Sequence, residues 1–206
     1  MKNQELHNKL FPKEKALLLS EIRNLDFSED LNRKDTEAFT ACCYRMVLMK
    51  SETFCIEGEQ CDIVAFLVSG HLYSSYKVKD IEYVTRLFLP PQFRIVSDFV
   101  SSLRGGVASC TIKSVDKSIL ICMSIHDLDA LYFMHPHLIK IERMLIVKND
   151  IANSQAMEFI RRHNNTERIR AFLKLYPEAF KYFTKTVIGS FLGVDRREVS
   201  KIYVSS

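Results

Sequence analysis

The sequence contains no apolar run long enough to cross a bilayer, and its charged N-terminus lacks the apolar core of a signal peptide. Its six cysteines form no C-x-x-C pair, and several lie inside apolar, strand-like runs, as buried free thiols do. We therefore expect a protein of the reducing cytoplasm that has no membrane partner.

Motifs of enzyme active sites are also missing: there is no Ser-His-Asp arrangement, P-loop or G-x-G-x-x-G sequence. His135 and His137 look like a metal pair, which leaves a metal-dependent β-roll enzyme as a distant alternative. Pro136 between them suits a helix start, however, and no other ligand motif has a matching spacing. His71 falls in a turn, where a structural role is commoner than haem ligation. We expect no enzymatic activity, no metal site and no cofactor.

The charge of the chain is unevenly distributed. Residues 161–206 hold ten Lys and Arg against four Asp and Glu, a net charge of +6, whereas residues 1–160 have a net charge of −2. A basic C-terminal segment on a slightly acidic body suggests a polyanionic partner, although a solvated basic surface is the simpler explanation of charge alone.

The hydrophobic pattern predicts three parts. Residues 1–125 comprise a polar amphipathic helical segment up to about residue 40, then short runs rich in Val, Ile, Phe, Tyr and Thr that are typical of many strands. Residues 126–163 are helical, with a helix of about 25 residues from Pro136 and a hinge near His163. That helix suggests a dimerisation seam, and packing against the chain's own β-domain is the alternative. Residues 164–206 form a third part.

This third part predicts three helices. Asn165 or Thr166 caps the first, and Gly193 ends the second in the left-handed conformation. Asp195 and Glu198 have the spacing of a capping box for the third helix. Two short helices joined by a tight glycine turn form a helix-turn-helix, although a plain helical hairpin has the same pattern.

Here the sequence resembles a known family. "NTERIRAFLKLYPEAF" and "TKTVIGSFLGVDRREVSKIY" are similar to the C-terminal domain of bacterial cyclic-AMP receptor protein / fumarate-nitrate regulator (Crp/Fnr) transcription regulators. "FCIEGEQCDIVAFLVSGHLYSSY" resembles the family's cyclic-nucleotide-binding-type β-roll. The resemblance implies an α+β fold, in which an N-terminal jelly-roll-type β-roll is followed by a long dimerisation helix and a C-terminal helix-turn-helix.

The resemblance also implies a DNA-reading surface. Arg196, Arg197 and Lys201 match the base-reading positions, and Ser200 matches a position near the DNA backbone. Lysine lacks the fork of arginine, which makes a bidentate guanine contact at residue 201 doubtful. Phosphate contacts are expected near a helix N-terminus, from Thr184, Lys185 and Thr186.

The family's nucleotide-binding members carry "G-E-(L/I)-(A/G)…R-(S/T)-A", and this chain departs from that pattern. Ser97 and Asp98 stand at the Gly-Glu positions, and Ala108 and Ser109 stand where Arg-Ser is expected. Without the arginine, the cyclic phosphate loses a charge-assisted bond worth roughly 1.5–3 kcal/mol. Arg104 and Arg94 are near in the sequence, but the spacing does not show that either of them replaces the missing arginine. We expect a degenerate effector pocket that does not respond to cyclic AMP.

We therefore predict a sequence-specific, DNA-binding transcription regulator that acts as a homodimer on a pseudo-palindromic duplex. RNA polymerase is a candidate partner, and the sequence does not identify an effector. The alternative is a β-roll protein that senses a small molecule or binds a partner protein, and whose terminal helices only pack.

Overall fold

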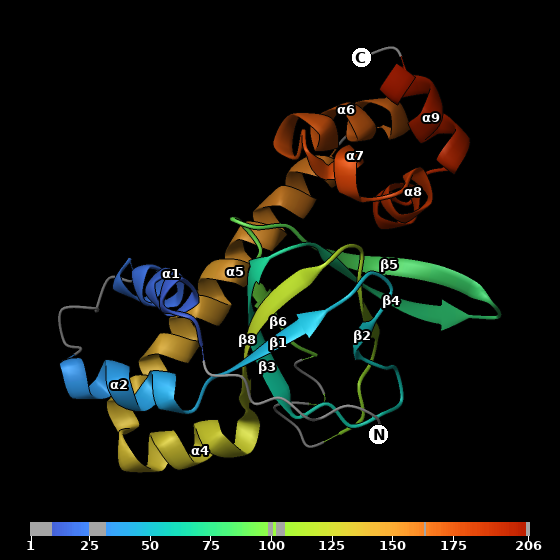
Figure 1. Cartoon of the computed structure of the whole chain (residues 1–206). Coiled ribbons are helices and arrows are strands. Elements are labelled where there is room, and N and C mark those ends of the chain that lie inside the picture. Colours follow the sequence, from blue (N-terminus) through green and yellow to red (C-terminus); the bar gives the residue numbers. More distant parts are fainter. Residues whose placement is uncertain (1–9, 25–31, 99–100, 102–105, 163, 205–206) are drawn as a thin grey trace.

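The computed structural model describes residues 10–24, 32–98, 101, 106–162 and 164–204 (Figure 1). The helices are α1 Pro12–Arg23, α2 Arg33–Ala41, α4 Ile125–Met134, α5 Ile139–Arg161, α6 Asn165–Leu175, α7 Ala179–Tyr182, α8 Lys185–Leu192 and α9 Arg196–Val204. The strands are β1 Tyr44–Leu48, β2 Thr53–Cys55, β3 Ile63–Ser69, β4 Leu72–Val78, β5 Ile81–Phe88, β6 Ile95–Val96, β7 Thr111–Ser114 and β8 Ser118–Ser124.

Two antiparallel sheets, with strand orders β1-β8-β3-β6 and β2-β7-β4-β5, form the β-roll. Leu67, Leu72, Ile112 and Leu120 are completely buried in the inner core between them. This arrangement confirms the predicted fold, a β-roll followed by a long helix and C-terminal helices.

The sheet β1-β8-β3-β6 is buried on both faces, which explains the nearly continuous apolar sequence of β3. Successive side chains of a strand point to opposite faces. Ala65 and Leu67 accordingly belong to the inner core, and Phe66 packs in a second core on the outer face. In β8, Ile121 and Met123 also belong to this outer core.

Helices α1, α2 and α4 and the first half of α5 cover that outer face (Figure 1). The amphipathic segment predicted before residue 40 thus contains two helices. Pro12 occupies the first turn of α1, and the Asn32 side chain caps α2 by accepting the Asp35 N–H at 3.0 Å. The two helices bring Ile22 and Phe39 to the same core.

Helix α5 has 23 residues and follows a short 3-10 turn, Pro136–Leu138, close to the predicted start and length. It leads to the helices α6–α9, which pack on the β4–β5 side of the roll (Figure 1). One continuous core joins Val84 and Leu87 of β5 to Phe172, Ile188 and Val199 of these helices. None of the helices that the structure describes is long and apolar enough to cross a membrane.

Candidate nucleic-acid interface and effector cradle

The turn between α8 and α9 has the glycine geometry that its sequence predicts. Gly193 ends α8 with φ 67°, in the left-handed region. A Cβ on Gly189 would lie 2.9 Å from the carbonyl oxygen of Val194, so the turn itself requires a small residue there. The close approach involves the turn backbone and explains why glycine is tolerated inside this short helix.

Helix α9 is positioned by its first and buried residues. The Asp195 carboxylate accepts the Arg197 N–H at 2.6 Å and so satisfies one N-terminal donor. Val199 and Ile202 are buried against the other helices. The Oε2 atom of Glu198 is buried without a hydrogen-bond partner among the described residues, and no bond from Glu198 completes the predicted capping box.

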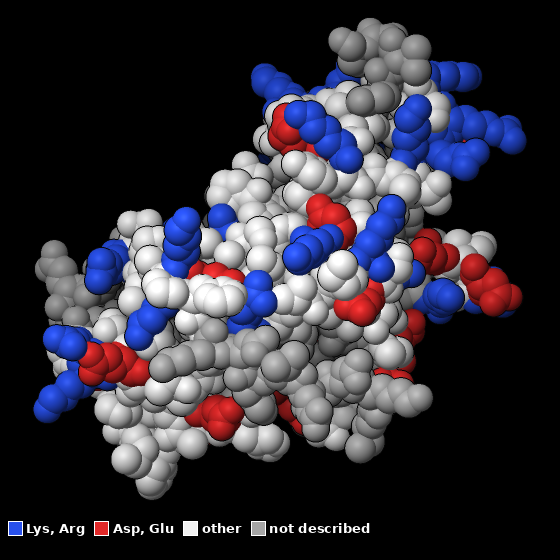
Figure 2. Space-filling view, viewed as in Figure 1, with Lys and Arg blue, Asp and Glu red and all other residues white. Residues whose placement is uncertain are grey.

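The side chains of Arg196, Arg197 and Lys201 are exposed. Figure 2 shows Lys and Arg projecting from the end of the molecule formed by α6, α8 and α9, with few acidic side chains among them. Because Val199 and Ile202 face inward, the buried side of α9 is separate from the side that carries the three cations. This arrangement can meet a polyanion without unfolding any part of the core.

Four residues are predicted to contact the DNA backbone. They lie on α8, at its N-cap, or on α9: Thr184, Lys185, Thr186 and Ser200. Thr184 is exposed, and its hydroxyl caps α8 by accepting the Val187 N–H at 3.2 Å. Thr186 is exposed and Lys185 half-buried in the first turn of α8, and Ser200 is half-buried on α9. The first turn of a helix favours anions, because its free N–H groups point outward.

Arg168 holds the first predicted helix to the second. Its guanidinium donates a hydrogen bond to the Leu192 carbonyl at 3.1 Å, at the C-terminal end of α8, where helix carbonyls lack partners. The predicted cap of α6 was wrong by one residue: Asn164, and not Asn165 or Thr166, accepts the Glu167 N–H at 3.0 Å.

The C-terminal helices are hydrogen-bonded to the β-roll, a feature that the sequence did not predict. The Ser190 hydroxyl of α8 donates to the Glu82 carbonyl at 3.0 Å and accepts the Val84 N–H at 2.9 Å. Strand β5 is an edge strand with a register shift opposite Ser74 and Ser75. Ser190 therefore satisfies backbone groups that the sheet leaves open.

A second contact joins the same two parts. The His71 ring stacks on Tyr182 with centroids 3.6 Å apart, and its Nδ1 lies 2.7 Å from Asp116 Oδ2. His71 thus has a structural role, as expected for a turn residue. His135 and His137 approach Asp35 at 3.6 and 3.0 Å, and the described residues contain no group of three ligands that could hold a metal.

The effector cradle is the name given to the predicted effector pocket: Ser97, Asp98, Arg104, Ala108 and Ser109. The structure brings Asp98 and Ser109 together there, and Arg104 lies outside the described residues. Asp98 Oδ1 accepts the Ser101 N–H at 2.9 Å, and its Oδ2 accepts the Ser109 N–H at 2.9 Å and hydroxyl at 2.8 Å. The Cys110 thiol adds a bond to Oδ2 at 3.3 Å. Burial alone would raise the pKa of Asp98, but these hydrogen bonds outweigh it and hold the pKa below its usual value.

The other residues of the cradle are buried or engaged elsewhere. Ser97 and Ala108 are buried, and Ala108 exchanges backbone hydrogen bonds with Gly58 and Glu59. Arg94 does not replace the missing arginine, because its guanidinium donates to the Leu67 and Val68 carbonyls and lies over the Phe66 ring. The cradle therefore has the buried Ala108 where the family pattern has an arginine, and the Asp98 carboxylate, at the family's glutamate position, bonds to the neighbouring Ser109.

Neither a protein-family model nor a curated protein sequence matches this chain. Solved structures do. CLP, the c-di-GMP-responsive global regulator of Xanthomonas campestris, matches with a TM-score of 0.63 and 12% identity over 84% of this chain and 91% of its own. FixK2 from Bradyrhizobium japonicum matches with a TM-score of 0.62 and 15% identity over 79% and 83%.

A putative cAMP-binding regulatory protein from Silicibacter pomeroyi DSS-3 matches with a TM-score of 0.59 and 14% identity over 93% of this chain and 86% of its own. At these identities the likeness concerns the fold. The three matches include most of each chain, so the order of roll, long helix and C-terminal helices is shared by this chain and the regulators it is similar to.

Proposed function

We propose that this chain is a sequence-specific, DNA-binding transcription regulator of the Crp/Fnr type that does not respond to cyclic AMP. The observation that carries the proposal is the outward placement of Arg196, Arg197 and Lys201 on α9, whose opposite side is buried. Regulators with the same fold, such as CLP, support a role in gene expression. Such a protein acts in the cytoplasm.

In this proposal α9 enters the major groove with its N-terminal half toward the bases. The Arg196 and Arg197 guanidinium forks match the O6 and N7 acceptors of guanine, whereas Lys201 supplies a single point charge. Thr184, Lys185 and Thr186 meet a phosphate at the N-terminus of α8, and Ser200 lies near the backbone. An arginine that makes two hydrogen bonds to one guanine has a fixed orientation relative to that base. The two arginines are therefore the main source of sequence preference in this proposal.

Helix α5 supports a homodimer. Val147, Ile151 and Phe159 of α5 are 43%, 52% and 42% exposed, although all three are large and apolar. Their spacings of four and eight residues place them along one side of the helix. A two-fold dimer through this side would present two copies of α9 about 34 Å apart, one DNA turn, to a pseudo-palindromic site. RNA polymerase bound to the same DNA is a candidate partner.

Asp98 supports the lack of a cyclic AMP response. Its carboxylate takes the two backbone N–H groups of Ser101 and Ser109 that would otherwise be available to an anion. A cyclic phosphate would meet the negative charge of Asp98 there. Calorimetry with cyclic AMP should detect no binding at millimolar concentration.

A salt titration on random duplex DNA tests DNA binding. Each phosphate contact releases counterions, so the logarithm of the binding constant should fall with a slope of about −0.9 per contact against the logarithm of salt. The triple variant Arg196→Ala, Arg197→Ala, Lys201→Ala should flatten this slope. The matched control removes three exposed lysines from other helices: Lys13, Lys34 and Lys140. Equal losses in both variants would refute an interface on α9.

A further inference from the structure

Three of the cysteines lie together in the inner core of the β-roll, beside the Asp98 carboxylate. Cys55 and Cys61 are buried there, with 4% and 6% of their surface exposed, and Cys110 is half-buried against the same core. All three are free thiols. The Cys55 thiol donates to the Cys110 carbonyl at 3.4 Å, and the Cys55 and Cys61 side chains are hydrogen-bonded to each other. The inner core therefore contains a pair of thiols in direct contact.

A short turn, residues 56–60, joins the two members of this thiol pair. Gly58 has φ 83°, in the left-handed region, and the Glu59 N–H donates to the Ile56 carbonyl at 3.0 Å. The Gly58 N–H donates to the Ala108 carbonyl and the Ala108 N–H to the Glu59 carbonyl, which fastens the turn to the neighbouring chain segment. All residues of the turn are exposed. The thiols are buried, but the segment that joins them lies on the surface.

The two thiols of the pair are not equivalent. The Cys61 sulfur accepts a hydrogen bond from the Cys55 thiol and another from the Ile63 N–H, and these bonds lower the pKa of Cys61 although burial opposes them. The same bond between the thiols, together with burial, raises the pKa of Cys55. Since the thiolate is the nucleophile in cysteine chemistry, Cys61 is the member of the pair that reacts first with an electrophile.

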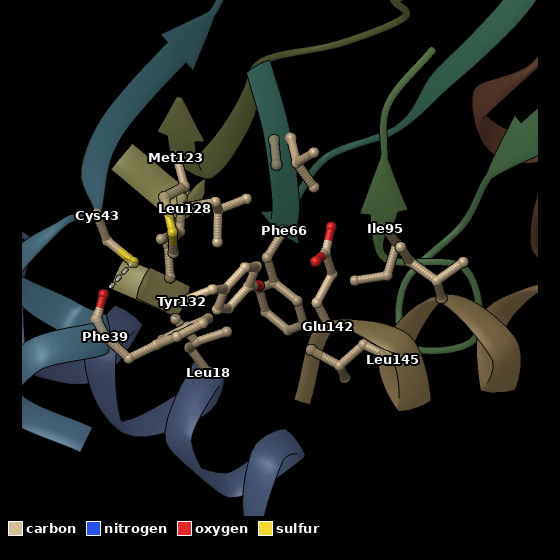
Figure 3. A pocket seen from close by; sticks show the side chains of 14 residues that line it. Leu18, Phe39, Cys43, Phe66, Ile95, Met123, Leu128, Tyr132, Glu142 and Leu145 are labelled. Atoms are coloured by element: carbon tan, nitrogen blue, oxygen red, sulfur yellow. Dashed lines mark hydrogen bonds between the residues drawn. The ribbon is translucent and has the colours of Figure 1, made fainter. Parts of the chain in front are cut away.

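The other cysteines lack this arrangement. Burial, and then the hydrogen bond of its thiol to Asp98, raise the pKa of Cys110 to about 12, so this thiol stays protonated at neutral pH. Burial also raises the pKa of Cys122, whose surface is completely buried. The Cys42 and Cys43 thiols donate to carbonyls of α2 in the outer core, where Figure 3 shows the bond of Cys43. The pair in the inner core is therefore the most reactive of these thiols.

We propose that Cys55 and Cys61 form a reversible disulfide when the protein reacts with hydrogen peroxide. In the first step the Cys61 thiolate attacks one peroxide oxygen: the S–O bond forms, the O–O bond breaks, and the leaving hydroxide takes up a proton to become water. In the second step the Cys55 sulfur attacks the Cys61 sulfenic acid, the S–O bond breaks, and the released hydroxide takes the proton of the Cys55 thiol. Two thiols and one peroxide thus give one disulfide and two waters.

Contact between the two thiols favours the disulfide over further oxidation. A sulfenic acid condenses with a nearby thiol, whereas without one it proceeds to sulfinic acid, which is not readily reduced. Because Cys55 already contacts Cys61, the fold does not have to open to bring the second thiol to the first. The S–S bond is about 2.0 Å long, shorter than the contact between two thiols, so oxidation draws the ends of the turn 56–60 together. In a reducing compartment such a disulfide is transient.

Mass spectrometry of the full chain tests the proposal. The reduced protein is treated with hydrogen peroxide at neutral pH, the remaining thiols are alkylated in denaturant, and the chain is digested with trypsin. Residues 51–77 hold both cysteines and contain no Lys or Arg before Lys77, so the disulfide should give one tryptic peptide that is two hydrogen atoms lighter and unalkylated. Cleavage after Glu57 and Glu59 should then leave two fragments that stay linked until they are reduced.

The disulfide should form more than about ten-fold faster than the Cys110 thiol is lost. A link from Cys55 or Cys61 to any other cysteine, within one chain or between two, would overturn the proposal. Two alkylated thiols in the peptide 51–77 after excess peroxide, or added oxygen in place of the lost hydrogens, would overturn it as well.

Serine variants separate the two roles. In Cys55→Ser the hydroxyl keeps a hydrogen-bond donor for Cys61, and the Cys61 sulfenic acid, left without a second thiol, should be trapped by dimedone. Cys61→Ser should give neither a disulfide nor a dimedone adduct at Cys55. The matched control is Cys110→Ser, which keeps a hydroxyl donor for Asp98 and should form the disulfide at the wild-type rate.

Thermal unfolding of each reduced variant verifies that it is folded. A dimedone adduct at Cys55 in folded Cys61→Ser, or no adduct at Cys61 in folded Cys55→Ser, would refute the assigned roles. Loss of the disulfide in folded Cys110→Ser would place Cys110 in the reactive pair and refute the pair proposed. Because no DNA is present, these results are independent of the DNA-binding proposal.

Discussion

The Asp98 carboxylate holds the effector cradle together, and its removal should destabilise the fold strongly. Asp98→Ala deletes the acceptor of four hydrogen bonds and leaves the buried Ser101 N–H and the part-buried Ser109 N–H without it. An unsatisfied buried donor costs about 1–3 kcal/mol, so the loss of the Ser101 bond lowers the free energy of unfolding by about that much, and the part-buried Ser109 donor adds to the loss. Urea unfolding followed by circular dichroism measures this loss.

The Asp98 carboxylate should also make the stability of the fold depend on pH. Its pKa is depressed in the folded state, so its stabilisation is fully present above the unfolded pKa of about 3.9 and is lost as the pH falls toward the folded pKa. The stability gap between the wild type and Asp98→Ala should be constant from about pH 7 to 5.5 and should shrink below about pH 4.

The exposed Asp129→Ala provides the control, and its effect on the free energy of unfolding should stay within about 0.5 kcal/mol at neutral pH. A gap for Asp98→Ala below about 1 kcal/mol at neutral pH, or one that does not change on acidification, would refute the reasoning. Such a result would mean that water or another group satisfies the Ser101 and Ser109 donors.

Three further predictions concern the proposed regulator. Arg196→Ala should weaken operator binding by about 1–3 kcal/mol and relax its sequence preference in a gel-shift series, whereas an equal loss on all sequences would make Arg196 a phosphate contact. Ile151→Glu places a charge on the apolar side of α5 and should yield monomers in sedimentation, and an intact dimer would argue against that seam. Ser190→Ala should speed hydrogen exchange at the Val84 amide and cost about 1–2 kcal/mol, with Thr186→Ala as the unaffected control.

Features set by neighbouring residues could be predicted from the sequence. The short runs rich in Val, Ile, Phe, Tyr and Thr indicated the strands of the roll, and Gly193 indicated the end of α8, because both signals depend on local backbone geometry. The exposure of Arg196 and Arg197 followed from the helical period. The cap of α6 was missed by one residue, since Asn164 and Asn165 are chemically identical candidates and only the coordinates distinguish them.

Contacts between distant residues could not be predicted. Ser190 bonds to Val84, 106 residues away, and nothing in the serine's own sequence context marks a partner on an edge strand. The role of Asp98 depends on the return of the chain at Ser109 and Cys110. The sequence showed that the arginine is absent, but not that the Asp98 carboxylate accepts the Ser101 and Ser109 N–H groups.

These two distant contacts constrain different parts of the molecule. The cradle inside the roll is occupied by Asp98, so an effector that binds there must first displace a carboxylate held by four hydrogen bonds. Helix α5 continues to a core that joins β5 to α8 and α9. Any movement of α5 relative to the roll must therefore repack that core or strain the Ser190 bonds.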